Sequence, residues 1–172
     1  MSLSLFKKLL KRQEKKKEKI LKPYGVVTIW ENEKEDSGII FKEKNNLIVD
    51  SYFNIIVGLF SGDTNKQISS LALGDGGVVN GILQSPSLSD TTLYSQVFQK
   101  DTIENISIES ILDKYISYNF IIEKNESNGT GAQVISEIGL KSVDGTLFAR
   151  KCFSEIVKTS EKILYIEWRL QW

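Results

Sequence analysis

Apolar and polar side chains alternate without interruption at the end of the chain. The apolar positions are Leu164, Ile166, Trp168, Leu170 and Trp172, and the residues between them are Tyr165, Glu167, Arg169 and Gln171. Successive side chains of a strand point to opposite faces of a sheet, so this period of two predicts a strand with one buried face. We therefore expect the chain to end inside a sheet, with Trp168 and Trp172 in a core rather than on a sugar-binding platform.

Two further strands are predicted just before this one, over residues 134–140 and 147–157. Asp144-Gly145 lies between them, and this dipeptide is typical of a tight hairpin in which both central residues adopt positive φ. The sequence thus predicts three consecutive antiparallel strands. Earlier strands are expected over five segments that are rich in β-branched residues or that alternate. They are residues 24–30, 38–42, 68–73, 93–103 and 115–123.

One segment has a helical period instead. Its apolar residues are Ile48, Val49, Tyr52, Phe53, Ile56, Leu59 and Phe60, which form a stripe along a helix of about residues 46–61. Several strands with Gly, Asn and Asp at the turns, together with one such helix, predict a mainly β protein. We expect an antiparallel β-sandwich with the helix packed against it.

The segment after residue 73 is rich in glycine and small polar residues. Gly74-Asp75-Gly76-Gly77 precedes neither a helix nor a lysine, so we interpret it as a tight turn and not as a phosphate loop. Residues 78–92 form a long connection. Because a loop of this length is uncommon in a compact domain, we expect it to be functional or to be an arm at an interface.

Charge divides the chain into two parts. Residues 1–22 carry nine Lys/Arg and two Glu, a net charge of +7, whereas residues 23–172 carry thirteen Lys/Arg and twenty Asp/Glu, a net charge of −7. The prediction is a basic helical arm, over residues 1–22, joined to an acidic β-sandwich domain, over residues 23–172. Such asymmetry indicates a partner for the arm or contact with the acidic surface of another copy.

The arm is either a solvated helix or a peg whose first two turns dock into another subunit. In the second case the docking face consists of Phe6, Leu9 and Leu10, and the electrostatic steering comes from Lys15, Lys16 and Lys17. Binding of the arm to nucleic acid or to an acidic membrane surface is a weaker alternative, because interleaved aromatic residues and glycines are lacking.

Several classes of chemistry are disfavoured by composition. Histidine is absent, which removes histidine-based general bases and the usual triads, and Cys152 is the one cysteine and is expected to fill space in a strand. Asp63, Asp75 and Asp90 lie near glycines but lack the alternation of a calcium loop. We expect no enzyme activity, no cofactor and no metal. The cations Arg150, Lys158 and Lys162 are expected to keep the sheet faces soluble.

From about residue 46 onward the chain resembles small structural proteins of tailed bacteriophages, of the tail-collar and tail-fibre-attachment kind. The blocks that carry the resemblance are Asn46-Leu47-Ile48-Val49-Asp50, Ile68-Ser69-Ser70-Leu71-Ala72-Leu73-Gly74-Asp75-Gly76, Asp90-Thr91-Thr92-Leu93, Glu137-Ile138-Gly139-Leu140, Asp144-Gly145-Thr146-Leu147-Phe148-Ala149-Arg150 and Lys158 before the Trp168 strand. The resemblance implies a virion component in a ring or at a symmetry axis, without catalytic activity or cofactor. Since no fibre shaft follows, it implies a collar, neck, fibre-adaptor or decoration subunit.

The leading hypothesis is therefore a structural virion protein that assembles into a symmetric oligomer and docks to other virion proteins. With neither a membrane span nor a secretory signal in the sequence, we expect it to fold in the host cytoplasm and to reside in the virion. Two alternatives stay open. One is a carbohydrate-binding module that uses exposed aromatic side chains such as Trp30 and Tyr94, and the other is a nucleic-acid-binding protein that works through the arm.

Overall fold

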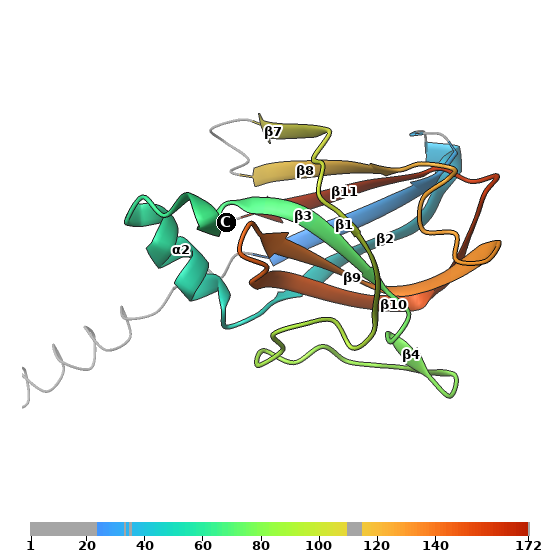
Figure 1. Ribbon diagram of the computed structural model, residues 1–172, viewed down its shortest axis with the longest axis horizontal. Coiled ribbons are helices and arrows are strands. Elements are labelled where there is room, and N and C mark those ends of the chain that lie inside the picture. Colours follow the sequence, from blue (N-terminus) through green and yellow to red (C-terminus); the bar gives the residue numbers. More distant parts are fainter. Residues whose placement is uncertain (1–23, 33, 35, 110–114, 172) are drawn as a thin grey trace, which may run out of the picture.

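The computed structural model describes residues 24–32, 34, 36–109 and 115–171. These residues form a mainly antiparallel β protein with one α-helix (Figure 1). The strands are β1 Tyr24–Glu31, β2 Ile39–Ile48, β3 Ile68–Gly74, β4 Val78–Val79, β5 Ile82–Leu83, β6 Gln96–Lys100, β7 Asn105–Glu109, β8 Tyr115–Ile122, β9 Ala132–Ser142, β10 Leu147–Thr159 and β11 Leu164–Gln171. The helices are α2 Tyr52–Phe60 and the 3₁₀ turns η1 Asp36–Gly38 and η2 Thr64–Lys66.

Nine strands form one sheet in the order β6-β3-β9-β10-β2-β1-β11-β8-β7, which bends over at β2. Most of β2 pairs with β1, from Gly25↔Asn46 to Trp30↔Ile39. The last two residues of β2, Leu47 and Ile48, pair with β10 instead. The sheet therefore splits into two layers that share β2, and it forms the predicted sandwich.

The core lies between these layers and takes apolar side chains from both. The buried cluster includes Val27, Ile29, Phe120, Ile166 and Trp168 from β1, β8 and β11, and Leu71, Leu73, Ile138, Leu140, Phe148 and Phe153 from β3, β9 and β10. In β11 the predicted alternation is confirmed, since Leu164, Ile166, Trp168 and Leu170 are each at most 2% exposed. Burying each such side chain stabilises the fold by about 1.5–3 kcal/mol. Trp172 lies outside the described residues.

The pairing of the last three strands differs from the prediction. β9 and β10 form an antiparallel pair, but β11 lies between β1 and β8 in the other layer. The turn differs too: Gly145 has φ of 82°, whereas Asp144 does not adopt positive φ. Because β9 ends at Ser142 and β10 begins at Leu147, the loop holds four residues, and a loop of that length does not need two left-handed positions.

The helix was expected to begin at about residue 46, but it begins six residues later, at Tyr52. Leu47 and Ile48 continue β2, where they pair with Ala149 and Arg150, and α2 begins only at Tyr52. Pairing to β10 overrides the local helical period here.

The helix packs on the sandwich, as expected, through buried Ile55 and through Tyr52, which lies against the core cluster. Phe53, Leu59 and Phe60 of the expected stripe are exposed instead.

Two further segments were missed. β7 was not predicted at all, and the connection over 78–92 was expected to lack secondary structure, although it contains the β4–β5 hairpin. Both are short, and β4 and β5 have two residues each, so neither gives a periodic signal. β1, β3 and β8 lie where the sequence predicts them.

Cys152 provides a test of the core. Its side chain is 3% exposed, and burial raises the pKa of its thiol to about 11. At pH 8 roughly one thiol in a thousand would be ionised, and a reagent has no access to it. We expect Ellman's reagent to release no colour from the native protein and one equivalent after unfolding in guanidinium. Rapid labelling of the native protein at the rate of a free thiol would contradict this packing.

Candidate interaction surface

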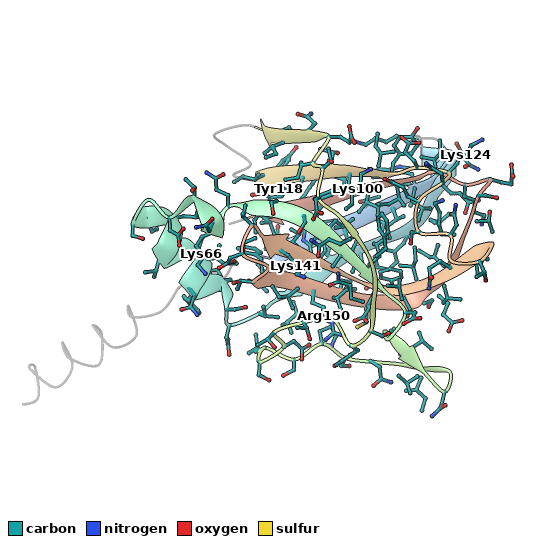
Figure 2. The ribbon with its side chains drawn as sticks, in the orientation of Figure 1. Lys66, Lys100, Tyr118, Lys124, Lys141 and Arg150 are labelled. Carbon is teal, nitrogen blue, oxygen red and sulfur yellow. The ribbon has the colours of Figure 1, made fainter. Side chains whose placement is uncertain are left out.

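The most unusual feature of the interior is a pair of charged residues. Glu137 of β9 and Arg150 of β10 are both fully buried, and the Arg150 Nη2 donates to Glu137 Oε2. Figure 2 shows Arg150 between the sheet and the connection that precedes β6. The expectation that Arg150 keeps a sheet face soluble is therefore wrong. A buried charge needs partners, and this one has several.

The guanidinium of Arg150 is held by the connection on its other side. Its Nη1 donates to Asp90 Oδ2 at 2.8 Å and to the Thr92 carbonyl at 3.4 Å. The ring of Tyr94 stacks on it, with 3.4 Å between the guanidinium carbon and the ring centroid. The planar cation thus joins the sheet to three residues of the connection.

Glu137 holds the same segment through its backbone. Its Oε1 accepts the amide N–H of Ser95 at 2.7 Å and that of Gly76 at 3.2 Å, and its Oε2 accepts the amide N–H of Tyr94 at 3.0 Å. With Arg150, four donors surround one carboxylate. Charge-assisted bonds of this kind fix both ends of the connection, and they leave the carboxylate no free position for a substrate.

The glycines at the start of the connection allow its close approach to β9. A Cβ at Gly77 would lie 1.9 Å from the Ser136 carbonyl oxygen, and the Gly77 amide donates to Ser136 Oγ at 2.9 Å. The turn expected at residues 74–77 is present at Gly76-Gly77, and its backbone lies directly against that of β9. A side chain at position 77 would push the connection off the sheet.

Between its two fixed ends the connection forms the β4–β5 hairpin. Asn80 and Gly81 have φ of 52° and 75°, as a two-residue type I′ turn requires. The base is closed by the Gln84 amide, which donates to the Gly77 carbonyl at 2.8 Å. We call the exposed apolar residues of this hairpin the hairpin tip; they are Val79, Ile82 and Leu83, which are 48%, 66% and 52% exposed.

A second apolar surface lies on α2. Phe53, Val57 and Phe60 are 53%, 67% and 89% exposed, and their spacing of four and three residues places them on one side of the helix. We call these three residues the α2 outer face. Apolar side chains grouped on two surface elements are typical of protein contacts, whereas singly scattered ones are not.

The other candidate residues have structural roles. Lys158, expected on a soluble face, is fully buried and donates to Asn128 Oδ1 at 2.9 Å, and burial lowers the pKa of its ammonium group. Lys162 lies nearer the surface and pairs with Glu31 at 2.9 Å. Asp63 accepts the Asn65 amide and caps η2. No group of three potential metal-ligating side chains occurs among the described residues.

The aromatic residues suggested for glycan binding do not form an open platform. Trp30 is 9% exposed, so the expectation that it is an exposed stacking surface is wrong. Tyr94 is 49% exposed, but its ring covers Arg150 and its hydroxyl donates to the Ser85 carbonyl at 3.0 Å.

A shallow groove of about 390 Å³ lies on the outer side of β8 and β11. Its polar lining pairs with its own neighbours. Lys34 donates to Asn119 at 2.8 Å, and Glu167 accepts from Ser117 at 3.2 Å and from Arg169 at 3.0 Å. The groove thus presents satisfied polar groups.

The docking residues expected on the arm lie outside the described residues. They are Phe6, Leu9, Leu10, Lys15, Lys16 and Lys17. One sign of the buried pair is visible in the sequence, since Glu137 and Arg150 are each a charged residue within an otherwise apolar strand segment. Within the part of the chain that the structure describes, no helix has the length and hydropathy to cross a bilayer.

Comparisons with family models, with curated proteins and with solved structures produced no match in any of the three. The resemblance to phage collar proteins therefore stays a prediction from the sequence blocks.

Removing one charge of the buried pair should be costly. In Glu137→Gln the Arg150 cation loses its fully buried carboxylate partner and keeps only Asp90, which is 14% exposed, so we expect a loss on the order of 3 kcal/mol in the free energy of unfolding. The measurement is urea unfolding followed by tryptophan fluorescence. The connection should also become sensitive to limited proteolysis.

The matched control is Glu31→Gln, which breaks the more exposed ion pair with Lys162. Its cost should be under about 1 kcal/mol, with proteolysis unchanged. Equal losses in the two variants would show that the buried pair has no special role.

Proposed function

We propose that this chain is a structural subunit of a tailed-bacteriophage virion, of the collar, neck, fibre-adaptor or decoration kind. It assembles with copies of itself into a symmetric oligomer and docks to other virion proteins. Its contribution is a rigid body with defined contact surfaces, and no chemical step is assigned to it.

One observation carries this proposal: four of the six sequence blocks that resemble the phage proteins meet at a single place in the fold. Gly76, Asp90, Glu137 and Arg150 come from four separate blocks, and they are joined by the hydrogen bonds of the buried pair. Each of these blocks is a weak signal alone, but together they supply the residues of one hydrogen-bonded cluster. That convergence supports a common fold with the collar family over a chance match of short segments.

The contact surfaces also fit a subunit of an assembly. The hairpin tip and the α2 outer face belong to different elements, one fixed to β9 and β10 and one following β2. A ring needs two different surfaces on each copy, because each subunit contacts its neighbours through unlike patches. A contact repeated around an axis also holds firmly even when each instance is weak.

The charge division of the chain favours the same arrangement. The basic residues 1–22, at +7, and the acidic remainder, at −7, attract each other between copies or toward an acidic partner. Charge complementarity of this kind mainly speeds encounter and fixes register.

The direct test is the composition of purified particles. Virions released by the producing strain are banded on a density gradient and analysed by quantitative mass spectrometry. We expect peptides of this chain at several copies per particle, in constant ratio to the other structural proteins. Particles that lack these peptides would overturn the proposal.

The anchor role of the arm has its own test. A chain without residues 2–22 should keep the thermal transition of the full-length protein, because the sandwich begins at Tyr24. It should nevertheless be absent from particles when it replaces the full-length protein. Incorporation equal to that of the full chain would remove the anchor role from the arm.

A further inference from the structure

The α2 outer face remains largely exposed among the described residues, although the ring of Phe53 contacts that of Tyr52. Gly25 at the start of β1 pairs with Asn46, six residues before Tyr52 begins α2. The described chain thus begins at the end of β2 that leads into this helix, and 23 further residues precede Tyr24 in the sequence. Chain of that length is available to cover the face in the same copy or in another.

We propose that the α2 outer face is the docking site for residues 3–10 of a neighbouring copy of this chain. The inference deepens the proposed function, because it names the contact by which the subunits join one another. The occupant is a short amphipathic segment of the arm, and the receptor is Phe53, Val57 and Phe60.

The apolar residues of the two segments match in spacing. Leu3, Phe6 and Leu10 follow one another at three and four residues, and a helix over this segment, as the sequence predicts, would bear them on one side. Phe53, Val57 and Phe60 form the corresponding stripe on α2. Two such stripes can pack along each other as ridges and grooves, and they would bury side chains that are now in water.

The polar residues around the stripes are complementary as well. α2 itself carries no charged residue, and exposed Asp50 precedes it. The apolar end of the arm is flanked by Lys7, Lys8 and Lys11. Apolar contact would thus be framed by opposite charges, which sets the orientation of the segment.

Reach favours a neighbouring copy over the same one. Fourteen residues lead from Leu10 to Tyr24, and a helix of that length spans about 21 Å. The nine residues of α2 span about 13 Å and lie at the root of the arm. An arm that is helical, as the sequence predicts, would therefore reach beyond the length of its own α2.

The test is a disulfide cross-link between two differently tagged full-length variants, Leu9→Cys and Phe60→Cys. Both positions are usable because the native Cys152 is buried. We expect mild oxidation of the mixture to yield the mixed dimer. Ile106→Cys, at a comparably exposed apolar site on β7, serves as the matched control and should give no dimer with Leu9→Cys.

Three outcomes would overturn the inference. They are the absence of the mixed dimer, Phe60→Cys dimers as the main product, and a cross-link that forms only within one chain carrying both cysteines. As a second measurement, Phe60→Asp should lower the oligomer fraction in native mass spectrometry by at least about tenfold, because it places a charge in an apolar contact. Ile106→Asp should leave the oligomer fraction unchanged.

These results are separable from those on particles. A mixed dimer formed by a protein that is missing from virions would uphold the contact and reject the phage role. A protein found in virions that gives no mixed dimer would reject the contact alone.

Discussion

The structure depends on one buried ion pair, between Glu137 and Arg150. The two side chains come from adjacent strands, and each makes further hydrogen bonds to the same connection. Three segments distant in sequence are thereby joined at one point. Ion pairs in the interior add little net free energy, because both groups lose their water, but they enforce a unique arrangement wherever one charge without the other is prohibitive. Here that arrangement is the position of the residues between β3 and β6.

A fixed connection has a direct effect on the surface. Without its bonds to Glu137 and Arg150, a segment rich in Gly and Ser would sample many conformations and would lose entropy on binding a partner. Held at both ends, it presents the β4–β5 hairpin in one orientation. An apolar contact made by a preorganised hairpin is stronger for the same area. The buried Glu137–Arg150 pair thus determines how the exposed apolar residues of the hairpin tip are presented.

Sequence patterns predicted the parts of the fold in which one face is buried and the other is not. The alternation from Leu164 to Leu170 is such a case. Patterns of this kind were also sufficient to predict the mainly β class of the fold. The helix start failed because Leu47 and Ile48 obey a helical period but pair with β10, a long-range contact that no local window contains. The exposure of Phe53 and Phe60 was missed for a related reason: an apolar stripe predicts a contact without saying whether the contact is inside the chain. Arg150 looked like a surface cation because its partners, Asp90 and Glu137, are far from it in sequence.

The place of β1 in the sheet has a mechanical consequence. Tyr24, where the described chain begins, opens a strand that is flanked on both sides, by β2 and by β11. Tension applied to the preceding residues along the strand axis would load both hydrogen-bond ladders together in shear, instead of peeling bonds one at a time from an edge. A subunit tethered at this end can thus carry force without unravelling from its attachment point.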